Sequence, residues 1–373
     1  MKPTITSTAL LAIAAIAAAG GAHARASQAY TLPFNQMVVF GDSLSDTGNL
    51  TNLLAGTAYA SDAATPPYYA AGEFTDGANT TPSTNTLGLW DQQFAADLNI
   101  PSPTPALSTS FLSTYLFTGG YSLIPGGTNF AVAGSVSGNT VINLAANQFQ
   151  AGMSTQVAAY ESQFAAGDPV AANSLYVFWG GANDILNAAS ASGATQSTVI
   201  SAGTTAANNI SGYIGNLAGR GAKYFLWVNL PPLNATPKGS ASSLAGAIGT
   251  ASTDFNSTQA VDIGTLQAGN PGVSIISVDV NALFNDMAAN RSAYGFTNIN
   301  SAAQGSKVNP DQYLFWDNLH PTTAADAYVA QAAAADTINA LGVPTPEPSD
   351  LLLLLTGFGF VTTLRHRRCR LPH

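Results

Sequence analysis

The chain has 373 residues, of which 46% are hydrophobic and only 8% are charged, so it can form a core and lacks the composition of a disordered protein. Its 20 acidic and 11 basic residues give a net charge of −9, which argues against a nucleic-acid partner because such partners require a basic surface. The single cysteine, Cys369, excludes an intrachain disulfide and zinc sites of the finger type.

Residues 1–26 have the parts of a secretory signal peptide. Lys2 supplies a positive charge, residues 9–19 form an apolar run, and the sequences AHA and ARA within 22–26 are suitable cleavage sites. The apolar run is short for a membrane span, although an uncleaved anchor helix is the alternative interpretation. We therefore expect an exported protein, extracellular or associated with the cell envelope, whose folded domain covers residues 27–342.

Within that domain, short apolar runs alternate with segments that can form helices. Runs of four to six residues rich in Val, Ile and aromatic side chains are typical of strands buried on both faces. The alternation predicts an α/β fold with a parallel sheet between two helical layers. The expected strands are Met37–Phe40, Leu175–Trp179, Tyr224–Val228 and Val273–Val278. The expected helices are Met153–Ala166, Ser197–Leu217, Ser242–Leu266, Val280–Asn290 and Thr322–Leu341.

The segment Thr51–Ser122 lacks a clear hydrophobic period and contains one Pro-Pro pair at 66–67 and one Tyr-Tyr pair at 68–69. It predicts a long insertion with one short helix near Leu89–Leu98. Because active sites of parallel sheets lie at the carboxyl ends of the strands, the insertion is expected near the site.

A serine follows the first expected strand directly, in the string GDSLSDTGN at residues 41–49. A nucleophile is commonly presented at such a strand end, and Gly41 permits a tight turn. Ser43 needs a base, because a serine hydroxyl is a weak nucleophile near neutral pH. The other histidines lie in the expected leader and tail, so His320 is the one available base, and Asp317 precedes it by three residues. Asp317 can hold the imidazole in the required tautomer.

Four separated segments together resemble the blocks of the GDSL-type SGNH hydrolases. They are GDSLSDTGN at 41–49, GTNFAVAGS at 127–135, GGAND at 180–184 and FWDNLHPT at 315–322, in the family order. Residues 72–77 and Trp90 also resemble the phospholipase, lecithinase and hemolysin branch. The resemblance implies a three-layer α/β/α sandwich of flavodoxin-like type, with a mainly parallel five-stranded sheet.

The resemblance further implies a catalytic triad of Ser43, Asp317 and His320. It places the oxyanion hole at the backbone N–H groups of Ser43 and Gly134 and the side-chain amide of Asn183. No metal or organic cofactor is required by this chemistry. We expect structural roles for three neighbouring aspartates, Asp42, Asp46 and Asp184. Six aromatic residues either line an acyl pocket or belong to the core: Tyr68, Tyr69, Phe74, Trp90, Trp179 and Trp316.

These residues predict a secreted serine esterase or lipase that acts through an acyl-enzyme. The ester could belong to a lipid, a phospholipid or an acetylated glycan. A non-catalytic matrix or surface protein is the alternative from another class, and the four intact site residues speak against it. An acyltransferase with the same triad also remains open, because it differs only in what accepts the acyl group.

Residues 343–373 form a three-part tail. The sequence VPTPEPS at 343–349 precedes an uncharged run over 351–364 and then the basic cluster RHRRCR at 365–370. The run is short for a membrane span, and basic residues stay on the cytoplasmic side. This order resembles the PEP-CTERM sorting signal of Gram-negative bacteria, which implies an exosortase-type partner and membrane contact through the tail. A plain C-terminal anchor is the alternative.

Overall fold

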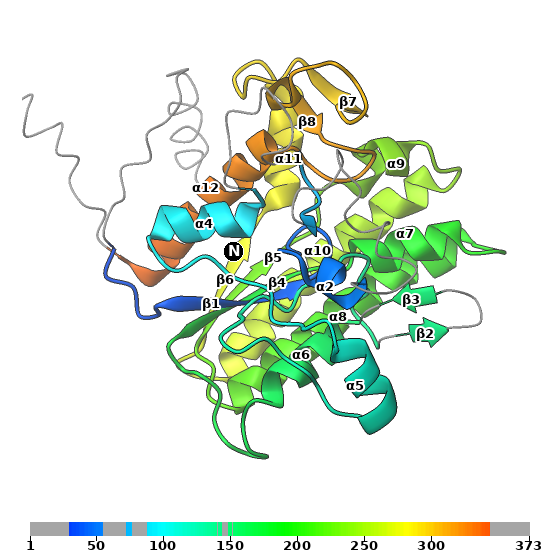
Figure 1. Cartoon of the computed structure of the whole chain (residues 1–373). Helices are drawn as coiled ribbons and strands as arrows, with labels where there is room; N and C mark the ends of the chain where they lie inside the picture. Colours follow the sequence, from blue (N-terminus) through cyan, green and yellow to red (C-terminus); the bar gives the residue numbers. More distant parts are fainter. Residues whose placement is uncertain are drawn as a thin grey trace, which may run out of the picture.

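The computed structural model describes residues 30–54, 72–76, 88–139, 141–143, 148–150 and 152–343. The expected leader lies outside the described residues, as does the tail beyond Val343. The centre is a parallel four-stranded sheet in the order β1-β4-β5-β6 (Figure 1). The strands are β1 (Gln36–Gly41), β4 (Ser174–Trp179), β5 (Tyr224–Val228) and β6 (Ser274–Val278), so all four expected strands are confirmed.

Alternate side chains of these strands enter two separate hydrophobic cores. Phe40 and Phe178 belong to the core beneath α6 (Met153–Glu161), α7 (Ala182–Ser190), α8 (Gln196–Gly219) and α10 (Ala245–Gly269). Val39 and Val177 belong to the opposite core, which α4 (Trp90–Leu98), α11 (Val280–Ala289) and α12 (Thr323–Leu341) cover. The strands are mostly apolar because both faces are covered, which confirms the predicted α/β sandwich (Figure 1).

The described sheet has four strands, and the expected number of five was wrong. Residues 128–132 run parallel to β1 in the place of a fifth strand. The Val39 N–H donates to the Thr128 carbonyl at 2.9 Å, and the Phe130 N–H donates to the Val39 carbonyl at 2.8 Å. However, the ladder is incomplete, because the Gly41 N–H donates to the side chain of Gln156 at 2.9 Å instead of to this segment.

The insertion after β1 contains more helix than expected. Besides α4 it holds α2 (Asn49–Leu54), which begins before residue 51, and α5 (Phe111–Thr118). Helices this short leave little periodic signal. Several other short elements were not predicted. They are the helices α7, η4 (Leu233–Ala235), α9 (Pro237–Ser240) and η5 (Pro310–Gln312), the antiparallel pair β2 (Val141–Asn143) and β3 (Gln148–Gln150), and the parallel pair β7 (Asn298–Ala302) and β8 (Tyr313–Phe315). Within the described ranges, no helix is long and apolar enough to cross a membrane.

Helices α8 and α10 pack in close contact at Gly203. A Cβ at this position would lie 2.2 Å from the carbonyl oxygen of Ala251. We expect Gly203→Ala to lower the free energy of unfolding by about 1–3 kcal/mol in urea denaturation, because the helices must separate. Gly212→Ala on the same helix is the matched control, since nothing lies within 4 Å of an added Cβ there. It should raise stability by about 0.5–1 kcal/mol. Equal effects of the two substitutions would contradict the close contact.

Candidate active site

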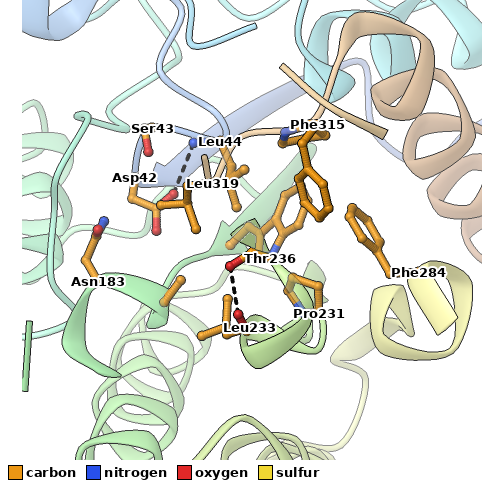
Figure 2. Close-up of a pocket in the computed structure, with 13 residues that line it drawn as sticks. Asp42, Ser43, Leu44, Asn183, Pro231, Leu233, Thr236, Phe284, Phe315 and Leu319 are labelled. Atoms are coloured by element: carbon orange, nitrogen blue, oxygen red, sulfur yellow. Dashed lines mark hydrogen bonds between the residues drawn. The ribbon is translucent and has the colours of Figure 1, made fainter. Parts of the chain in front are cut away.

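The loops that follow β1 and β4 meet at the carboxyl edge of the sheet. Gly41 pairs with Trp179 in the parallel register, and a Cβ on Gly41 would lie 2.4 Å from the Trp179 carbonyl oxygen. Glycine therefore allows the two strand ends to approach. Ser43 follows β1 and Asn183 lies in the first turn of α7 after β4, so both side chains reach the same edge (Figure 2).

A chain of hydrogen bonds joins Ser43, His320 and Asp317, the three residues expected to form the triad. The His320 Nε2 lies 2.7 Å from the Ser43 Oγ, and the His320 Nδ1 lies 2.7 Å from Asp317 Oδ2. The other carboxylate oxygen of Asp317 accepts from the backbone N–H groups of Leu319 and His320, each at 2.7 Å. The aspartate is thereby fixed against the loop that carries the histidine. Ser43 and His320 are both buried.

The charge distribution supports an ionised Asp317. Burial alone would raise the pKa of this carboxyl, but the charge of the His320 imidazolium and the hydrogen bonds from residues 319 and 320 outweigh burial. The pKa of Asp317 consequently lies well below its usual value. An anionic carboxylate at Nδ1 favours the tautomer with the proton on Nδ1, which leaves the lone pair of Nε2 directed at the serine. The carboxylate also stabilises a positive charge on the ring.

Asn183 lines the same depression as Ser43 and lies near Gly134. The side-chain amide of Asn183 donates to the Ser135 carbonyl at 3.0 Å, which places it next to Gly134. Its Nδ2 carries a second hydrogen. Gly134 is exposed and has a φ of +78°. Neither the Ser43 nor the Gly134 backbone N–H donates to another described residue. The expected donors are therefore brought to one side of the sheet edge with hydrogens available to a ligand.

A buried polar network holds the loop that carries Ser43. Both oxygens of Asp46 are used: they accept from the N–H groups of Gly48 at 2.9 Å, Asn49 at 2.6 Å, Leu50 at 3.1 Å and Ala133 at 2.8 Å. Burial still raises the pKa of Asp46 to about 6, because four hydrogen bonds offset only part of the desolvation. Asp46 thus ties the loop after β1 to the segment that carries Gly134. Its predicted structural role agrees with these bonds.

Gln156 of α6 supports the same loop and was not predicted from the sequence. Its amide accepts from the Gly41 N–H at 2.9 Å and donates to the Gly41 carbonyl at 2.8 Å and the Ser135 Oγ at 2.9 Å. A single glutamine in a helix carries no sequence signal of such contacts. Asp184 is likewise structural, as expected, because its carboxylate accepts from the backbone N–H and the hydroxyl of Ser137.

The predicted aromatic residues divide between the pocket and the core. Trp90, Trp179 and Trp316 are all buried, and Trp179 also lines the depression beside Ser43. Phe74 lies beside the His320 ring, with centroids 5.2 Å apart. The tyrosines at 68 and 69 lie outside the described residues. Within the described part of the chain, no group of three or more His, Cys, Asp or Glu side chains could hold a metal ion.

Comparison with known proteins places this arrangement in a family. The model of the GDSL-like lipase/acylhydrolase family matches residues 37–333. A GDSL esterase/lipase of Arabidopsis thaliana is 28% identical over 132 residues, covering 30% of this chain and 36% of the relative. A second is 30% identical over 96 residues, covering 22% and 25%. The Arabidopsis anther-specific proline-rich protein APG is 28% identical over 167 residues, covering 39% and 31%. The matches therefore span only 25% to 36% of these relatives' own length.

One buried carboxyl near the site should make stability depend on pH. Asp42 is 1% exposed; its Oδ1 accepts from the Leu44 N–H at 3.1 Å, while Oδ2 has no hydrogen-bond partner among the described residues. Burial raises the pKa of Asp42 to about 7, against the opposing hydrogen bond from Leu44 and the charge of His320. The folded state therefore bears the cost of a buried charge above pH 7 and is relieved of it as the carboxyl protonates at lower pH.

We accordingly expect Asp42→Asn to be more stable than the natural chain at pH 8, by on the order of 1–3 kcal/mol, and to lose this advantage as the pH falls from 7 toward 4. Urea denaturation at fixed pH values measures the difference. Asp168→Asn, at an exposed position, is the control and should show no such pH-dependent gain. A pH-independent difference for Asp42→Asn would contradict the raised pKa.

Proposed function

The chain belongs to the GDSL-like lipase/acylhydrolase family, and on this basis we propose that it is a serine hydrolase that cleaves carboxylic esters through an acyl-enzyme. The observation that carries the proposal is the hydrogen-bonded chain from Asp317 through His320 to Ser43. The adjacent N–H donors of Gly134 and Asn183 support it. The narrower assignment to the phospholipase, lecithinase and hemolysin branch stays a prediction from residues 72–77 and Trp90.

In the first half-reaction, the Ser43 Oγ attacks the carbonyl carbon of the ester while Nε2 of His320 takes the hydroxyl proton. The negative charge that develops on the carbonyl oxygen is stabilised by the backbone N–H groups of Ser43 and Gly134 and by the Asn183 amide. Asp317 stabilises the imidazolium. The His320 Nε2 then gives its proton to the departing alkoxide, which leaves as the alcohol.

In the second half-reaction, water attacks the acyl group on Ser43. His320 takes a proton from this water, and the tetrahedral intermediate collapses as the Ser43 Oγ regains its proton. The products are the free carboxylic acid and the restored enzyme. Transfer of the acyl group to a sugar hydroxyl instead of water would give a new ester, so analysis of the products distinguishes hydrolysis from acyl transfer.

Active-site labelling tests the nucleophile. A fluorophosphonate probe should modify the chain at Ser43, and the label should disappear in Ser43→Ala but persist in Ser113→Ala, which removes an exposed serine on α5. Ser43→Ala and His320→Ala should each lower kcat by roughly 10⁴- to 10⁶-fold, and the double variant should be no slower than the slower single variant, because residues of one catalytic unit are not additive. Multiplicative losses in kcat would show that Ser43 and His320 do not share a step.

We also propose that residues 1–26 direct export and that residues 343–373 are a sorting tail read by exosortase-type machinery. The described fold supports a separate tail, since α12 is followed by a cap at Gly342 and the Val343 N–H donates to the Ile338 carbonyl at 3.1 Å. The capped end of α12 favours a boundary at the start of the proline-rich segment.

A chain ending at Val343 should keep its esterase activity and pass from the membrane fraction to the soluble fraction in a Gram-negative host. Fractionation and an ester assay of both forms provide the measurement. The separation of tail and active site would be refuted if the shortened chain stayed folded but lost its activity. Recovery of the full-length chain entirely in the soluble fraction would refute membrane contact through the tail.

A further inference from the structure

The depression beside Ser43 has an apolar wall built from three separate elements. Leu233 comes from η4 after β5, Phe284 from α11 and Phe315 from the end of β8. Figure 2 shows Ser43 and Asn183 on one side of this depression and Phe284 on the opposite side. The three side chains therefore line the same depression as Ser43 and Asn183.

This wall is firmly packed. Leu233 is 1% exposed, Phe284 is 5% exposed and Phe315 is 3% exposed, and the rings of the two phenylalanines lie 6.5 Å apart between centroids. Both phenylalanines also belong to the core beneath α11 and α12. Because core side chains are close-packed, none of the three can move aside without disturbing its neighbours.

The depression leaves little room. The volume that the centre of a water-sized sphere can reach within it is about 20 Å³, whereas all of its empty space, open solvent included, is about 430 Å³. A cavity on the order of 10–15 Å³ holds one water molecule, and an apolar cavity near 150 Å³ is needed for benzene. The depression beside Ser43 consequently has room for a group of about the size of a methyl.

The orientation of the reaction assigns this space to the acyl group. His320 is not among the residues that line the depression, while Ser43 and Asn183 are. The leaving alcohol takes its proton from Nε2 of His320, so it must depart on the histidine side, where Phe74 lies against the ring. The acyl group, held by the Asn183 donor, remains on the side of Leu233, Phe284 and Phe315.

We propose that Leu233, Phe284 and Phe315 limit the acyl group to acetyl, so that the preferred substrates are acetyl esters rather than long-chain triglycerides or phospholipids. This assignment rests on the proposed function, because it concerns the acyl group carried by Ser43. These three side chains set no limit on the alcohol, because it departs on the histidine side.

Nitrophenyl acetate, butyrate and octanoate test the assignment, because they share one leaving group and differ only in the acyl chain. We expect kcat/KM to be highest for the acetate and lower by about tenfold or more for the butyrate. In Phe284→Ala the ratio of kcat/KM for the butyrate to kcat/KM for the acetate should rise by about tenfold, since part of the wall opposite Ser43 is removed. Leu233→Ala should shift the ratio in the same direction and serves if Phe284→Ala does not fold.

The matched control is Phe296→Ala, because Phe296 is a buried phenylalanine of the same core that does not line the depression. Its ratio of butyrate to acetate should stay unchanged. All rates are referred to the fraction of chain that a fluorophosphonate labels at Ser43. A labelled natural chain that prefers octanoate, or labelled wall variants with unchanged ratios, would overturn the acetyl assignment alone. Failure of Ser43 to label would instead overturn the proposed function.

Discussion

The parallel pairing of β1 with β4 is the constraint on which the rest of this structure depends. It brings the two strand ends to the same edge, with Gly41 opposite Trp179, and so places the loops that carry Ser43 and Asn183 side by side. Helices cover both faces of the sheet, so that edge is where loops can gather polar groups. The loop that carries His320 therefore meets both the Ser43 loop and the Asn183 loop at this one edge of the sheet.

The loops at this edge are held by carboxyl groups that are buried, where an ionised carboxylate is unfavourable. Asp46 satisfies four backbone N–H groups, and Asp91 accepts from Asn129, yet both carboxyls are buried and the pKa of each is raised. Asp42 is buried with one oxygen without a described partner. The edge of the sheet is therefore stabilised by hydrogen bonds to carboxylates whose ionisation the surrounding protein disfavours. Residues near a reactive centre often accept such a loss of stability.

The sequence was informative where a residue's neighbours in the chain determine its environment. Leu175–Trp179 is apolar at every position because both sheet faces are covered, so its strand was predictable. The three residues that form the hydrogen-bonded chain were also predictable, since a strand-end serine, a lone usable histidine and a nearby aspartate have few other uses together. Gln156 and Phe284 could not be identified in this way, because their contacts lie across the fold and leave no local pattern. The irregular segment in place of a fifth strand was also not predictable, because the Gly41 N–H donates to Gln156, which is distant in the sequence.

The bond between Ser43 and His320 joins residues 277 positions apart. During synthesis Ser43 thus emerges from the ribosome long before His320, and the intervening strands must pair before the two can meet. A nascent or prematurely terminated chain has Ser43 but lacks His320. On the proposed mechanism, the chain order delays activation of Ser43 until nearly the entire domain has been made.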